Sequence, residues 1–238
     1  MKSRRTFVLI DLSAYRENLL YLMNRVSPAK LMAVVKADGY GHGAVELAKV
    51  AQETGVESLA VAFLEEGIQL REAGIEIPIL VFNYVDLSLV PLARKNRLTL
   101  TLYSPAQLDE RARLALNILP GFQLVVDTGR RRLGQEGRES IQLYERAIEK
   151  GISVEGAYSH FATADERDSP LVSRQQELFA KFIEEAARVS GVKLLNHISN
   201  SAGVLTQKHD ERDFVRAGIS IYGLQRSEER RVGKECRS

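Results

Sequence analysis

Residues 34–43 read VVKADGYGHG and lie between an apolar run, Leu31–Val35, and a stretch with helical periodicity, Ala44–Glu53. This strand–turn–helix pattern places Lys36 at the end of a buried strand, where an amine costs desolvation free energy unless it is neutralised, paired or bound covalently. A lone lysine there is more often a surface residue. The three glycines that follow indicate a tight turn whose N–H groups can approach a phosphate. An amine beside such a turn is what pyridoxal phosphate (PLP) requires.

The same strand–helix alternation runs along the chain and sets the fold class. Several β-rich runs are continuously apolar, which is typical of buried parallel strands. Helices are expected to end at glycines, and the segment Ser104-Pro105-Ala106-Gln107 reads as a helix start. The β-rich runs are Thr6–Leu12, Leu31–Val35, Leu59–Ala62, Ile79–Phe82, Leu98–Leu102, Phe122–Val126, Ser153–Tyr158, Leu194–Ile198 and Ile219–Tyr222; the glycines are Gly55, Gly74, Gly151 and Gly191.

The number of strands favours one α/β architecture. Without Thr6–Leu12, eight strands remain, which predicts a (β/α)8 TIM-type barrel. The alternative is a doubly wound sheet, which usually carries a dinucleotide fingerprint after its first strand. The glycines of residues 39–43 are spaced two apart and follow a lysine, so they do not match that fingerprint.

Polar residues recur where the predicted strands end. Lys36 ends one strand, Asp127-Thr128-Gly129 follows another, and Ser159-His160 and Asn200-Ser201 follow two more. Active sites of such barrels are formed at the C-terminal ends of the strands. We therefore expect these residues to meet in one site.

Composition excludes several other classes of protein. The chain has 238 residues, 27% of them charged, and a net charge of +2, which gives no preference for nucleic acid or membrane. Its apolar runs are too short to span a bilayer, and its basic N-terminus is not followed by a signal-peptide core. The single cysteine, Cys236, excludes an internal disulfide framework and a cysteine-based metal site. These features fit a cytoplasmic enzyme, and they fit many other proteins equally well; we expect no metal site.

Five motifs, in order, give the chain a resemblance to a known family. They are VVKADGYGHG, VDTG with RLG five residues after its aspartate, YSHFATADE, HISNSAG and RAGISIYGL. This set resembles the PLP-dependent alanine racemases and, more broadly, the barrel class of PLP enzymes. The resemblance implies PLP as cofactor, alanine as substrate, a homodimer for the full-length enzyme, and a role in supplying D-alanine for peptidoglycan.

The resemblance also implies roles for the residues of the first motifs. Lys36 matches the lysine that carries the cofactor as a Schiff base and serves as one of two catalytic bases. Tyr40 matches a tyrosine that binds the cofactor phosphate. Arg132 matches an arginine near the cofactor's phenolic oxygen and the substrate carboxylate, although three successive arginines also suit a solvated turn. His160 matches a histidine packed beside the cofactor ring.

Roles for the last motifs follow in the same way. Ser201, Gly218 and Ile219 match phosphate contacts, the last two at the start of the eighth strand. Arg216 matches an arginine that faces the pyridine nitrogen. Because an arginine does not give up its proton, that nitrogen should stay unprotonated. This would limit delocalisation of a carbanion into the ring and so suit a racemase.

Two positions depart from the family pattern near Arg132. Many members have Met-Gly where this chain has Arg130-Arg131, and an arginine in place of that glycine is strained if the position needs a positive φ. Many members also have a lysine, often carbamylated, where this chain has Val125.

Comparison with the family predicts three segments. Residues 1–12 would form a strand that pairs with a second, β-rich domain; residues 13–226 would form the PLP-binding barrel; and the charged residues 227–238 would be a disordered tail unrelated to the family. In the family, the β-rich domain supplies the second base, a tyrosine, across the dimer interface. We therefore expect this chain to lack that domain and to be inactive alone.

Three other interpretations stay open. A related family of single barrels binds PLP without catalysis and has about this length. A serine or broad-specificity racemase, a decarboxylase or a dehydratase could use the same barrel. A nucleic-acid-binding module centred on Arg130–Arg132 is the weakest, because the charge is balanced and no basic stripe with aromatic residues occurs.

Overall fold

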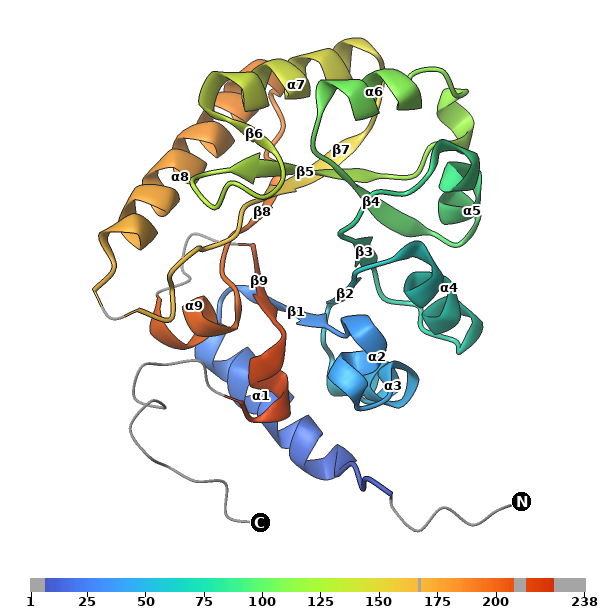
Figure 1. The fold of residues 1–238 in the computed structure, drawn as a ribbon, viewed down its shortest axis with the longest axis vertical. Helices are drawn as coiled ribbons and strands as arrows, with labels where there is room; N and C mark the ends of the chain where they lie inside the picture. Colours follow the sequence, from blue (N-terminus) through green and yellow to red (C-terminus); the bar gives the residue numbers. More distant parts are fainter. Residues whose placement is uncertain (1–6, 167, 208–212, 225–238) are drawn as a thin grey trace.

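A ring of parallel strands enclosed by helices forms the centre of the computed structural model, which describes residues 7–166, 168–207 and 213–224 (Figure 1). In the described residues the neighbouring strands follow the order β8-β7-β5-β4-β3-β2-β1-β9, and every pair is parallel. A short strand, β6 (Gln135–Glu136), pairs with β5 outside this path. The ring strands are β1 (Lys30–Val34), β2 (Ser58–Val61), β3 (Ile79–Val81), β4 (Leu98–Leu102), β5 (Phe122–Asp127), β7 (Val154–Tyr158), β8 (Leu195–His197) and β9 (Phe214–Ala217).

The ring is nearly closed, which confirms the barrel prediction. The last strand lies beside the first, with Met32 opposite Arg216. The remaining gap between β8 and β9 is bridged by two backbone hydrogen bonds: Asp213 N–H donates to the Asn196 carbonyl at 3.2 Å, and Arg216 N–H donates to the Ser199 carbonyl at 3.1 Å. A doubly wound sheet does not bring its first and last strands together in this way.

The predicted eighth strand is wrong. Ile219–Tyr222 forms a 3-10 helix, η3, and the strand is Phe214–Ala217. The apolar sequence of η3 is typical of a buried strand. By contrast, β9 contains Arg216, which is buried although an arginine in a sequence usually indicates a surface position. Gly218 and Ile219 therefore follow the end of β9 and do not begin a strand, so they lie at the barrel face where active sites form.

Helices surround the ring, and α7 and α8 cover the β5, β7 and β8 side (Figure 1). Ser104 caps α6 as predicted, accepting a hydrogen bond from Gln107 N–H at 3.2 Å, and Gly55 and Gly191 end their helices in the left-handed conformation. None of the described helices combines the length and apolar composition needed to cross a membrane. The α-helices are α1 (Leu12–Val26), α3 (Ala44–Thr54), α4 (Leu64–Glu72), α5 (Val90–Lys95), α6 (Pro105–Arg111), α7 (Gly137–Glu149), α8 (Pro170–Ser190) and α9 (Ser201–Thr206), with 3-10 helices η1 (Leu87–Leu89), η2 (Leu116–Ile118) and η3 (Ile219–Tyr222). The segment α2 (Lys36–Gly41) contains residues with left-handed φ values and is not a regular α-helix.

The core has two layers because successive residues of a strand face opposite sides. On β1, Leu31 and Ala33 pack toward the helices, whereas Met32 and Val34 point into the barrel. Most residues of both layers are apolar, which explains why most of the strands read as continuous apolar runs. The apolar residues of the inner layer are Met32, Val34, Ala60, Leu80, Val125 and Tyr158.

The N-terminal segment predicted to pair with a second domain has no partner among the described residues. Residues 7–11 belong to no strand, and Leu12 begins α1, whose first turn is capped by the Asp11 carboxylate. Phe7 and Val8 are 84% and 81% exposed, so no described element covers this apolar segment. A strand forms only when its backbone groups find a partner, and pairing with a second domain stays a prediction. Residues 1–6 of the predicted N-terminal segment and the predicted tail, residues 227–238, lie outside the described residues.

Candidate active site

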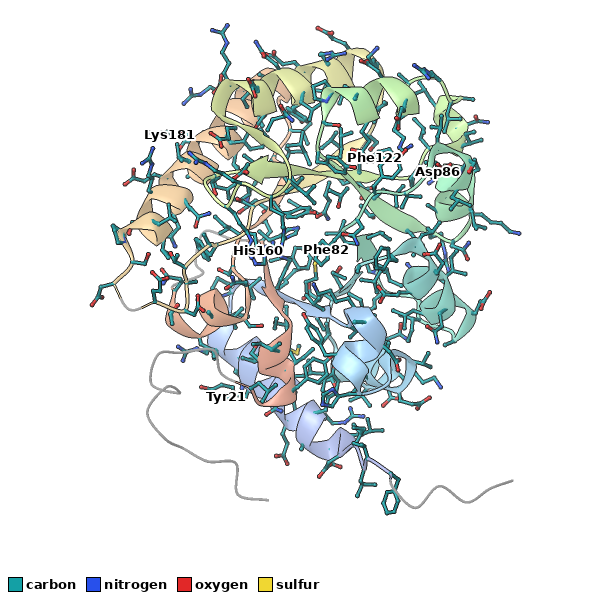
Figure 2. All side chains as sticks on the ribbon, viewed as in Figure 1. Tyr21, Phe82, Asp86, Phe122, His160 and Lys181 are labelled. Atoms are coloured by element: carbon teal, nitrogen blue, oxygen red, sulfur yellow. The ribbon has the colours of Figure 1, made fainter. Side chains whose placement is uncertain are left out.

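The C-terminal ends of the ring strands surround a cavity of about 710 Å³. Tyr158, Val125 and Val34, from the inner layer of the core, line it together with polar residues of the βα loops. Figure 2 shows His160 and Phe82 near the centre of the ring, whereas Lys181 lies on the outer helix α8. All eight predicted site residues line this one cavity: Lys36, Tyr40, Arg132, His160, Ser201, Arg216, Gly218 and Ile219.

Lys36 and Tyr40 are presented by an unusual backbone turn. Residues 37–40 complete about one turn of left-handed helix, with φ values of 53° at Ala37, 51° at Asp38 and 54° at Tyr40. This conformation costs an L-amino acid roughly 1–2 kcal/mol per residue. Surrounding contacts must therefore hold the turn in place.

Hydrogen bonds and packing against neighbouring helices supply that support. The Asp38 carboxylate accepts a hydrogen bond from Ala44 N–H at 2.8 Å, at the start of α3. The Glu66 carboxylate, from α4, accepts one from Ala37 N–H at 2.6 Å. Gly39 packs so tightly on α3 that a Cβ would lie 2.7 Å from the Leu47 side chain. The turn is thus fixed from two sides.

The Tyr40 hydroxyl, Ser201 and Gly218 form a small polar cradle. A Cβ on Gly218 would lie 2.6 Å from the Tyr40 hydroxyl oxygen and 3.6 Å from Ser201 Oγ. Ser201 Oγ accepts hydrogen bonds from the N–H groups of Gly218 at 2.9 Å and Ser220 at 3.4 Å, which leaves its own hydroxyl hydrogen free to donate to a ligand. Two hydroxyl groups around a position without a Cβ fit a phosphate. The adjacent residue Asn200, not Ser201, caps α9.

Arg216 points into the barrel from β9 and is 3% exposed. Its guanidinium donates to the carbonyl oxygens of Ser159 at 2.6 Å, Ile198 at 3.1 Å and His197 at 3.2 Å, and to a ring nitrogen of His197. These acceptors are neutral. Burial lowers the pKa of Arg216 to about 10, so the side chain remains protonated at neutral pH. The site therefore holds a buried, permanent positive charge.

Two histidines flank this guanidinium, and it fixes the tautomer of one of them. His160 faces a donor at each ring nitrogen, Arg216 at Nδ1 (3.3 Å) and the Asn200 amide at Nε2 (3.4 Å). Arg216 can only donate, so His197 Nδ1 must accept, and His197 Nε2 carries the hydrogen. His197 Nε2 then donates to Gln123 Oε1 at 2.7 Å. Burial, followed by the nearby Arg216, lowers the pKa of His160 to about 2 and that of His197 well below its usual value. Both rings are therefore neutral at pH 7.

Arg132 lies in the loop after β5, and its side chain is exposed at the cavity. Among the described residues it has no hydrogen-bond or ion-pair partner, so its charge is available to a ligand. The preceding Arg131 has φ 55°, which confirms the strain predicted for an arginine at this position. Val125 is buried in the inner core layer, where a lysine would need a partner for its charge.

Comparison with known proteins decides the family. The sequence profile described as "Alanine racemase, N-terminal domain" matches residues 10–226. The chain belongs to this family. It is 37% identical to the alanine racemase of Methanococcus maripaludis over 234 residues, and 40% identical to alanine racemase 1 of Bacillus subtilis over 227 residues. These matches cover 96% and 94% of the chain.

A solved structure of the same family agrees with the fold. The alanine racemase from Bacillus anthracis, with bound L-Ala-P, superimposes with a TM-score of 0.89 at 33% identity and covers 96% of this chain. The chain spans only 60% of that structure, and 62% and 58% of the Methanococcus and Bacillus subtilis racemases. It thus corresponds to the barrel portion of these longer alanine racemases.

Sequence reasoning missed several residues of this racemase-family barrel. Tyr158 and His197 point inward from their strands, and their rings stack with centroids 5.1 Å apart beneath Arg216. Their polar side chains at inward-facing positions of apolar strands could have identified them as site residues. Glu66 was also missed, although a glutamate at the third position of a helix is a recognised capping signal.

Proposed function

We propose that this chain is the PLP-binding barrel of an amino-acid racemase that interconverts L- and D-alanine. The observation that carries the proposal is the convergence of eight residues, from strand β9 and from the loops after β1, β5, β7, β8 and β9, on one cavity, with Lys36 next to a fixed turn. When bound, PLP supplies an electron sink that makes the α-proton of an amino acid removable. The family relationship supports alanine as the substrate.

The residues of the cavity suit the parts of this cofactor. The Lys36 amine would bind it covalently, and the cradle formed by Tyr40, Ser201 and Gly218, with Ile219, would hold its phosphate. Arg216 would face the ring nitrogen. Because this guanidinium is protonated and buried, it would donate a hydrogen bond and leave that nitrogen unprotonated. Arg132, whose guanidinium has no ion-pair partner among the described residues, would bind the substrate carboxylate.

Racemisation requires a proton carrier on each face of the substrate. Lys36 is one candidate. His160 is a poor second carrier, because its pKa is lowered to about 2 by burial and by Arg216. Tyr158 is also unsuitable, since burial raises its pKa and its hydroxyl is bonded to Thr101 Oγ1 at 3.0 Å. We therefore expect the 238-residue chain to racemise alanine slowly or not at all by itself.

The family relationship supports further parts of the proposal. In this view the second base belongs to a β-rich domain of a partner subunit, and the complete enzyme is a cytoplasmic homodimer that supplies D-alanine for peptidoglycan. Selection for alanine over serine would depend in part on that domain. A barrel that binds PLP without catalysis remains the second candidate, because neither His160 nor Tyr158 suits the role of a second proton carrier.

A cofactor titration with an activity assay tests these proposals. The purified chain mixed with PLP should develop a visible absorbance band that is lost in Lys36→Ala and kept in Lys49→Ala, a control on the exposed side of α3. The rate of L- to D-alanine conversion should stay near background. Absence of a Lys36-dependent band in folded protein would contradict the cofactor assignment, and rapid racemisation would contradict the need for a second domain.

A further inference from the structure

We propose that Glu66 is a positioning residue that fixes the backbone next to Lys36 for cofactor binding. One carboxylate accepts hydrogen bonds from three backbone N–H groups that belong to two βα loops. Oε1 binds Ala37 N–H at 2.6 Å, and Oε2 binds Ala62 N–H at 2.7 Å and Phe63 N–H at 3.0 Å. This role rests on the proposed function of Lys36.

The bond to Ala37 acts at the point where the turn is most constrained. Ala37 follows Lys36 directly and is the first residue of the left-handed turn, with φ 53°. Its N–H belongs to the peptide plane that also contains the Lys36 carbonyl, so fixing this N–H fixes the position from which the lysine side chain leaves the backbone. A hydrogen bond to a carboxylate is stronger than one between neutral groups, and so it offsets part of the conformational cost.

A simple helix-capping role can be separated from this one. Capping of α4 uses Oε2 alone, because the N–H groups of Ala62 and Phe63 both point at that oxygen. Glutamine has one acceptor oxygen, and its amide nitrogen can only donate. In Glu66→Gln, the oxygen should stay with the two cap donors, because the opposite orientation would leave both unpaired. The variant thus keeps the cap and loses the bond to Ala37.

The test compares Glu66→Gln with Glu65→Gln, which removes the same charge from the exposed neighbouring position. Loss of a charge-assisted hydrogen bond is expected to weaken PLP binding roughly tenfold or more in Glu66→Gln, measured from the Lys36-dependent absorbance band. Hydrogen exchange without PLP should become faster in peptides that cover residues 36–44. In Glu66→Gln, hydrogen exchange in α4 should match that of the unchanged chain. In Glu65→Gln, both PLP affinity and hydrogen exchange should match those of the unchanged chain.

The outcomes separate this inference from the proposed function. If the unchanged chain gives no Lys36-dependent band, the cofactor proposal fails, while hydrogen exchange still decides whether Glu66 fixes the turn. Equal PLP affinity and equal exchange in the two variants would overturn the inference. If Glu66→Gln does not fold, Glu66→Asp keeps the charge but is too short to reach both loops, and it should show the same two effects. Failure of both variants to fold would make Glu66 structural and overturn the proposal.

Discussion

Replacing Arg131 by glycine should stabilise the chain, because the arginine occupies a backbone conformation that glycine adopts freely. Its φ is 55°, in the left-handed region. The side chain is exposed, and its backbone N–H, which donates to Asp127 Oδ1 at 3.1 Å, is kept in the variant. The substitution should therefore remove strain without removing a native hydrogen bond.

The expected size follows from two opposing effects. Relief of left-handed strain contributes roughly 1–2 kcal/mol. The greater freedom of glycine in the unfolded chain cancels roughly 0.5–1 kcal/mol of this. The net gain in the free energy of unfolding should be about 0.5–1 kcal/mol, which corresponds to a rise in Tm of roughly 1–4 °C for a domain of this size.

Thermal and urea unfolding of three variants would measure this gain. Arg131→Ala removes the guanidinium but keeps a Cβ, so it should show no stabilisation. Arg97→Gly relieves the same strain at φ 51° in the loop before β4, far along the chain from the site, and should give a similar gain. Equal stability of Arg131→Gly and Arg131→Ala would refute the backbone explanation.

Two further predictions concern the cradle and the buried histidines. Gly218→Ala would place a Cβ 2.6 Å from the Tyr40 hydroxyl, so PLP affinity should fall at least about tenfold while the thermal transition stays cooperative; unchanged affinity would remove Gly218 from the phosphate site. Stability should fall as pH drops below about 6.5, because His160 and His197 gain protons in the unfolded chain but resist them when folded. The free energy of unfolding should fall with a slope that approaches about 1.4 kcal/mol per pH unit for each histidine. In His197→Gln, urea unfolding should show this slope reduced by the contribution of one histidine. An unchanged slope in the variant would show that His197 is not one of the groups responsible.

Sequence patterns located most of the barrel because its strands are buried on both sides and therefore apolar throughout. The pattern failed at β9, where the buried Arg216 interrupts the apolar run. Local patterns do not show which distant group satisfies a buried charge or covers an exposed strand.

The sequence predicted those residues of the candidate site that directly follow a strand. Barrel geometry carries strand-end residues such as Lys36 and His160 to one face, whatever the details of the loops. The left-handed turn and its link to Glu66 were not predictable, because they depend on a contact between residues 29 positions apart. The hydrogen bond from Arg216 to His197 Nδ1 likewise appears only when β8 and β9 meet.

The central claim is that the Lys36 amine binds PLP covalently. Borohydride reduction of the purified chain after incubation with PLP, followed by peptide mass spectrometry, tests this claim most directly. We predict that one equivalent of the reduced cofactor is found on Lys36, and that the modification is lost in Lys36→Ala. Labelling spread over exposed lysines such as Lys30 and Lys49, with Lys36 unmodified, would contradict it.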